Sequence, residues 1–92
     1  MIKGKDNPAE KKQEKQGLNN SLILFNDDIH SFDFVIETLI EVCEHEHLQA
    51  EQCALIAHYK GRCVVKSGAF SELKPKYDEM TKRGLTMSIE SA

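Results

Sequence analysis

Apolar residues recur along the chain with two different periodicities, one typical of helices and one of strands, and together they predict six secondary-structure elements. The run Ser21–Phe25 is apolar and is followed by Asn26-Asp27-Asp28, as expected for a buried strand that enters a turn. From Ser31 to Cys43 apolar residues return every three or four positions, while acidic residues occupy the opposite side. This spacing predicts an amphipathic helix with Ser31 as its N-cap.

The second half of the chain continues the alternation of helices and strands. A helix is expected over residues 48–59, burying its apolar positions, with Gly61 as its C-terminal stop; those positions are Cys53, Ala54, Ile56 and Ala57. The β-branched run 62–66 predicts a strand, and Leu85, Met87 and Ile89 alternate with polar residues as in a strand. Strand, helix, helix, strand, helix, strand is the order of an α+β two-layer domain.

The third helix, expected over residues 69–83, contains Pro75, which removes one helical hydrogen bond. If Ser71 is the N-cap, Pro75 is the fourth helical residue, and the lost hydrogen bond lowers the stability of the helix only slightly. If the helix starts near Ser67, a kink is expected.

Residues 1–19 contain almost nothing apolar, so burial there cannot offset the entropy of ordering the backbone. We therefore expect a disordered N-terminal extension over residues 1–19 and one folded domain over residues 20–92. No apolar run approaches the roughly 18 residues of a membrane span, and no apolar segment follows the first lysines as in a secretory signal. Three cysteines are an odd number for a disulfide framework, which favours reduced thiols and a cytoplasmic protein.

The net charge of −3 is distributed in three blocks. Residues 1–16 carry five lysines and three acids, residues 17–59 carry eight acids and no lysine or arginine, and residues 60–92 carry seven bases and four acids. The acidic middle block would repel phosphates and argues against nucleic acid as a partner. It is compatible with a cationic ligand, and also with an ordinary solvated helix face.

Three groups of residues are candidates for chemistry. Asn26-Asp27-Asp28 offers oxygen acceptors, although these residue types are also favoured in turns. His58 lies beside the small residues Ala54 and Ala57, which can leave a hollow next to it, although a histidine near an apolar face is more often a core residue.

Cys43, His45 and His47 are the third group and include soft metal ligands. Their spacing does not fit the usual zinc patterns, and a frayed, solvated helix end explains them better. We find no nucleophile paired with a base and no phosphate-binding glycine pattern, so we do not expect an enzyme.

The string Leu22–Asp28, the pair Phe34-Val35 and the string Ala57–Gly61 together resemble the ClpS adaptor family. Members of that family carry an apolar strand ending in Asn-Asp-Asp, an aromatic-Val helix start, and His-x-x-Gly about thirty residues later. The resemblance covers about residues 20–90 and implies a three-stranded antiparallel sheet packed against three helices. This chain has His30-Ser31-Phe32 where the family usually has Thr-Pro-Met, and Ala54 where a methionine is common.

The resemblance implies that the chain binds the free N-terminus of a protein, the N-degron, and delivers that protein to a Clp AAA+ unfoldase of the ClpA or ClpC type. It implies no catalysis, no cofactor and a monomer, with the N-terminal extension acting on the unfoldase. The α-amine would be held by Asn26, Asp27 and His58. The pocket for the first side chain would be lined by His30, Phe32, Val35, Ala54, Ala57 and Leu85.

The chemistry of the ligand suits these residues. An α-amino group has a pKa of about 7.7–8.0, so near neutral pH it is mostly a cation with three donors. Asn26, Asp27 and His58 offer a carbonyl oxygen, a carboxylate and a ring nitrogen as acceptors. Two other functions remain open: a small metal-binding regulator that uses Cys43, His45 and His47, and a protein-interaction domain resembling the C-terminal region of the ribosomal stalk protein.

Overall fold

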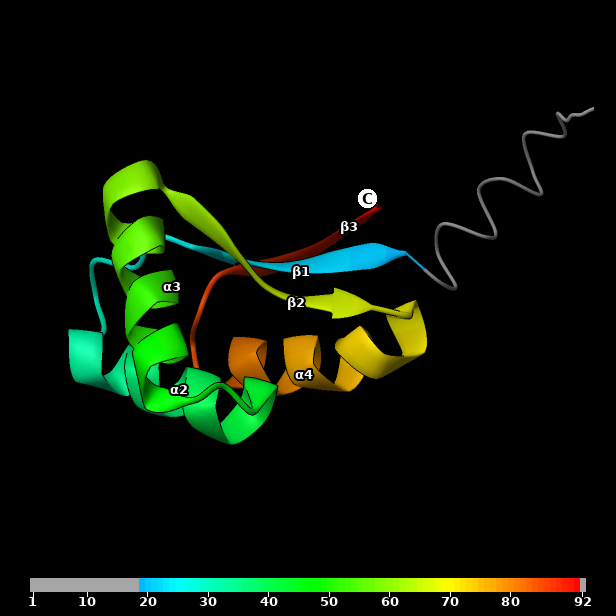
Figure 1. The fold of residues 1–92 in the computed structure, drawn as a ribbon, viewed down its shortest axis with the longest axis horizontal. Helices are drawn as coiled ribbons and strands as arrows, with labels where there is room; N and C mark the ends of the chain where they lie inside the picture. The colour runs from blue at the N-terminus through cyan, green and yellow to red at the C-terminus, as the bar shows by residue number, and fades with distance from the viewer. Residues whose placement is uncertain (1–18, 92) are drawn as a thin grey trace, which may run out of the picture.

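The computed structural model describes residues 19–91, in which the six elements follow in the predicted order (Figure 1). They are β1 (Asn20–Phe25), α2 (Phe32–Cys43), α3 (His47–Lys60), β2 (Arg62–Gly68), α4 (Phe70–Lys82) and β3 (Met87–Ser91). The α+β class and the order of elements are thereby confirmed. The predicted disordered extension lies outside the described residues except for residue 19. No helix within residues 19–91 is long and apolar enough to cross a membrane.

The three strands form one antiparallel sheet in which β1 lies between β2 and β3. Leu24 pairs with Cys63 of β2 on one side and with Met87 of β3 on the other. The register with β2 shifts between Leu22 and Ile23, so β2 carries one extra residue at that point. Because β1 is the central strand, the turn that follows it leaves from the middle of the sheet.

The three helices cover one face of this sheet, and the core lies between the two layers (Figure 1). Leu22 and Leu24 of β1 pack there against Leu39 of α2 and against Leu73 and Met80 of α4. All five side chains are almost fully buried. Such large side chains supply most of the burial free energy, at roughly 1.5–3 kcal/mol each.

α3 approaches the core through alanines rather than through large side chains. Its buried face consists of Ala50, Ala54 and Ala57, which recur at helical spacing. The predicted burial of Ile56 is wrong, because its side chain is 40% exposed. Ile56 directly precedes Ala57 and is therefore rotated by about 100° from the buried face.

The ends of α2 are stabilised in different ways. At its start the Ser31 hydroxyl accepts a hydrogen bond from the Phe34 N–H, as the sequence predicts for an N-cap. Its last turn contains no basic residue. Lysines from other elements supply the positive charge: Lys66 Nζ lies 3.1 Å from the Cys43 carbonyl oxygen, and Lys76 Nζ lies 3.3 Å from that of Val42.

His45 corrects the prediction that the end of α2 is frayed and solvated. Its side chain is buried, and Nε2 donates to the Val65 carbonyl oxygen at 2.7 Å. The connection between α2 and α3 therefore folds inward against β2 at His45, whereas His47 at the start of α3 is exposed, as predicted.

α4 begins between the two starts considered for it. Its N-cap is Ala69, whose N–H donates to the Glu72 carboxylate, and Pro75 is consequently the sixth helical residue. The missing N–H of Pro75 leaves the carbonyl of Ser71 without its usual helical partner. Ser71 is exposed, so water can satisfy that carbonyl at little cost.

Candidate functional site

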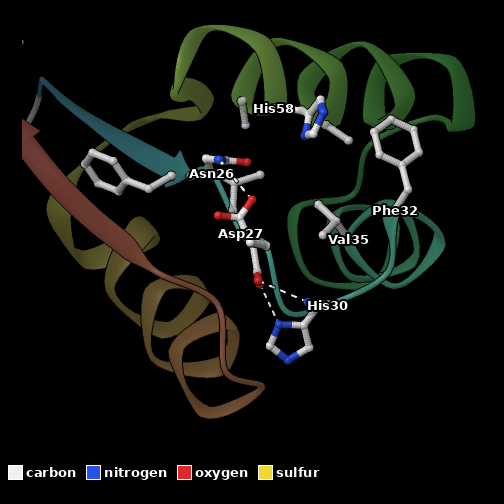
Figure 2. Close-up of a pocket in the computed structure, with 11 residues that line it drawn as sticks. Asn26, Asp27, His30, Phe32, Val35 and His58 are labelled. Atoms are coloured by element: carbon white, nitrogen blue, oxygen red, sulfur yellow. Dashed lines mark hydrogen bonds and ion pairs between the residues drawn. The ribbon is translucent and has the colours of Figure 1, made fainter.

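A cavity of about 260 Å³ lies between the turn after β1 and the helix α3 (Figure 2). One wall is polar and comes from the turn, and the other is largely apolar and comes from α2 and α3. The lining residues are Leu24, Phe25, Asn26, Asp27, Asp28, His30, Phe32, Val35, Ala54, Ala57 and His58.

Backbone hydrogen bonds explain why Asn26 and His58 meet although they are far apart in the sequence. Gly61 ends α3 in a left-handed conformation, with φ of 95°, and its N–H donates to the Ala57 carbonyl. The Gly61 carbonyl in turn accepts the Asn26 N–H at 2.9 Å. The turn after β1 is thereby fixed to the C-terminal end of α3, within one helical turn of His58.

The side chain of Asn26 is oriented by its neighbour Asp28. Its Nδ2 donates to Asp28 Oδ1 at 3.4 Å, and both residues are exposed. With its donor end used in this way, the amide presents Oδ1 as an open acceptor. Asp28 belongs to the candidate Asn-Asp-Asp string, but the sequence did not assign it to the α-amine site.

Asp27 uses its carboxylate within the turn. Its Oδ1 accepts hydrogen bonds from the backbone N–H groups of Ile29 and His30, at 2.7 and 3.1 Å, and Oδ2 lies 2.5 Å from His30 Nδ1. Burial alone would raise the pKa of Asp27, but these hydrogen bonds and the attraction of His30 together hold it below its usual value of 3.8. Asp27 therefore stays negative at neutral pH while most of its lone pairs are occupied.

His58 comes from the last turns of α3 and points toward the Asn26 turn (Figure 2). Its ring makes an edge contact with Tyr59, with 4.9 Å between the ring centroids. Within residues 19–91 its ring nitrogens have no hydrogen-bond partner. In a neutral imidazole one nitrogen carries the proton, and the other is then free to accept from a ligand in the cavity.

The apolar wall is built from two helices. Val35 of α2 and Ala54 and Ala57 of α3 are nearly buried, whereas Phe32 at the start of α2 is 42% exposed at the mouth of the cavity. The two alanines leave open the space that larger side chains would fill. Leu24 and Phe25 also line the cavity; they immediately precede Asn26 in β1, a proximity that could have identified them from the sequence.

Two of the predicted pocket residues lie differently from the others. His30 belongs to the lining, as predicted, but its ring lies on the far side of the turn from His58 and is directed away from α3 (Figure 2). Leu85 does not line the cavity: it is 3% exposed within the core, where its N–H donates to the Met80 carbonyl at the end of α4.

The three candidate metal ligands do not converge. Cys43 is buried with Sγ 3.5 Å from Met80 Sδ, His45 is bonded to the backbone of β2, and His47 is exposed. Within the described residues no three His, Cys, Asp or Glu side chains are grouped so that they could hold a metal ion. Burial raises the pKa of the Cys43 thiol to about 11, so this sulfur is a poor ligand and a poor nucleophile near neutral pH.

Comparisons with known proteins give two matches and one negative result. A family model described as "ATP-dependent Clp protease adaptor protein ClpS" matches residues 12–88. Among solved structures, ClpS2 of Agrobacterium tumefaciens bound to L-phenylalaninamide resembles this chain with a TM-score of 0.69 and 23% sequence identity, over 84% of this chain and 99% of that one. No curated protein matches the sequence significantly. The structural match confirms the fold, and the family match covers most of the chain.

Proposed function

Because the chain belongs to the ClpS family of ATP-dependent Clp protease adaptors, we propose that its cavity binds the free N-terminal residue of a substrate protein. In this proposal the chain acts as a monomer in the cytoplasm and delivers the substrate to a Clp AAA+ unfoldase of the ClpA or ClpC type. It forms and breaks no covalent bond, and it needs no cofactor.

The observation that carries the proposal is the pair of open acceptors on either side of the cavity. Asn26 presents Oδ1, and His58 presents a ring nitrogen that has no partner within residues 19–91. An α-ammonium group placed between them would donate to both. Asp28 supplies an exposed carboxylate beside Asn26, and Asp27 adds negative charge from within the turn.

The apolar wall then receives the side chain of the first residue. Phe32, Val35, Ala54 and Ala57 surround a space of about 260 Å³, which suits a large apolar side chain. The Agrobacterium relative was solved with L-phenylalaninamide, a molecule with a free α-amine and an aromatic side chain. That ligand supports the same division into an amine site and an apolar pocket here.

Simple magnitudes are compatible with this role. Charge-assisted hydrogen bonds contribute about 1.5–3 kcal/mol each, and burial of one Leu or Phe side chain adds roughly 1.5–3 kcal/mol. After the cost of association, the expected dissociation constant is on the order of micromolar. An adaptor must release its cargo, and this affinity permits release.

The decisive experiment compares peptides that differ only at the N-terminus. Fluorescence anisotropy should show binding of a peptide that begins with Phe or Leu, and loss of binding when the same peptide is N-acetylated. Acetylation removes the positive charge and two of the three donors while leaving the side chain intact. Equal affinity for the acetylated and free peptides would refute the proposal.

Two variants of the chain test the acceptors. Asn26→Leu and His58→Ala should each weaken binding of the Phe peptide by about tenfold or more. Gln49→Ala, an exposed change on α3, is the matched control and should bind as the unchanged chain does. Delivery is tested separately, by degradation of a Phe-initiated fluorescent reporter with a Clp unfoldase and its peptidase in the presence and absence of this chain.

A further inference from the structure

We infer that His30 is a positioning residue for the amine site: its side chain holds the far end of the Asn26–Asp28 turn, so that the acceptors stay aimed into the cavity. This inference rests on the proposed function. His30 contributes to the lining of the cavity, as expected from the sequence, and the inference adds a second role for its ring, which is directed away from His58 (Figure 2).

The contacts of His30 with Asp27 are the first argument. The Asp27 carboxylate accepts three hydrogen bonds. Two come from His30: its Nδ1 lies 2.5 Å from Oδ2, and its backbone N–H donates to Oδ1. The third comes from the backbone N–H of Ile29, which donates to the same Oδ1. The Asp27 side chain is only 8% exposed, so the hydrogen bonds are partly shielded from water. The turn is therefore closed by the Asp27 carboxylate, and His30 fixes the oxygen that the backbone leaves free.

The packing of the ring is the second argument. One side of the His30 ring stacks on Phe34 of α2, with 4.7 Å between centroids and 18° between planes. Gly84 lies beside the ring as well: a Cβ added there would come within 3.0 Å of His30 Cε1 and Nε2. The ring is thus confined by α2 and by the connection from α4 to β3, and its side chain is 25% exposed.

The shape of the turn shows why a second anchor is needed. One end is fixed by the backbone bond from Asn26 to Gly61. Between the two ends, Asp28 is exposed and Ile29 is 89% exposed, so neither is held by packing. Without His30 the segment after Asp27 would lose its side-chain support, and the geometry of Asn26 and Asp28 would be less well defined.

Three substitutions separate the hydrogen bond from the ring packing. His30→Asn keeps a donor close to the position of Nδ1 but loses the ring, His30→Phe keeps a ring on Phe34 but has no donor for Asp27, and His30→Ala removes both. His47→Ala is the matched control, since the His47 side chain is exposed and makes no hydrogen bond within residues 19–91.

The first measurement needs no ligand. Amide hydrogen exchange of Ile29 and His30, followed by NMR, reports whether Asp27 still accepts from both backbone groups. We expect exchange about fivefold faster or more in His30→Ala and His30→Phe, with His30→Asn and His47→Ala close to the unchanged chain. Unchanged exchange in His30→Ala would overturn the inference, whatever the chain binds.

The second measurement is the affinity for the Phe-initiated peptide. Binding should weaken by about fivefold or more in His30→Ala and His30→Phe and recover toward the original value in His30→Asn. If the unchanged chain does not bind the peptide, the proposed function fails. If the unchanged chain binds and all three variants bind equally well, only the role of His30 fails. If His30→Asn loses as much affinity as His30→Ala, the inferred role of His30 is also overturned, because the hydrogen bond to Asp27 would then not explain the loss of binding.

Discussion

Replacing Ala54 with methionine should change which first residues the cavity accepts. Ala54 is nearly buried in α3 and lines the cavity next to Val35 and Ala57. Methionine adds three heavy atoms that point into a space of about 260 Å³. A bulky first side chain will lose contact area first, because it fills more of that space than a smaller one.

The magnitude follows from the carbons excluded from the cavity. Each buried carbon contributes about 0.8 kcal/mol, so keeping two or three ring carbons of Phe out of the cavity costs about 1.6–2.4 kcal/mol. That corresponds to an affinity about 15- to 60-fold lower. A Leu side chain fills less of the cavity and should lose the burial of about one carbon. The Leu peptide should therefore bind only about fourfold more weakly.

The assay is fluorescence anisotropy with two peptides that differ only in the first residue, Phe or Leu. Leu55→Met is the control, because Leu55 lies on the same helix but does not line the cavity. Thermal unfolding of Ala54→Met establishes that the variant is folded. If both peptides lose affinity by the same factor in a folded variant, Ala54 does not shape the pocket for the side chain and the reasoning is refuted.

Three further predictions concern groups around the site and the core. Lys66→Met and Lys76→Met should each lower the free energy of unfolding, measured in urea, by about 0.3–1 kcal/mol, because each removes a cation from the C-terminal end of α2; unchanged stability in both would contradict this. The folded-state pKa of Asp27 lies below its usual value of 3.8, so its stabilisation is complete above the unfolded-state value and is lost as the pH falls through the folded-state value; Asp27→Asn should remove the part of the stability that is gained as the pH rises through this acidic range. Burial raises the pKa of Cys43 to about 11 and that of Cys53 to about 12, so in the native protein at pH 8 both thiols should react with Ellman's reagent much more slowly than after unfolding in guanidinium, and equal rates would be the contrary result.

The sequence predicted the elements well because their signals are local. The helical spacing before Cys43, the Ser31 N-cap and the glycine after α3 each depend on a few neighbouring residues, and the structure shows all three. The inward position of His45 and the exposure of Ile56 depend instead on how helices meet the sheet. A short apolar or histidine-containing string carries no information on that geometry.

The candidate site divides in the same way. The sequence identified Asn26 and His58, and the structure brings both to one cavity. It could not show that Asp27 is occupied by His30, because that pairing depends on the path of the turn. It also could not separate Leu85 from the pocket, since an apolar residue after α4 can face either the cavity or the core.

The alanine face of α3 has an evolutionary consequence. The large side chains that stabilise the domain lie on β1, α2 and α4, whereas the wall that meets a bound residue includes the small side chains of Ala54 and Ala57. Single substitutions at these two positions can resize the hollow while most of the folding free energy is left untouched. Related chains can therefore diverge in the cargo they prefer by stepwise mutation, without first acquiring a compensating change elsewhere.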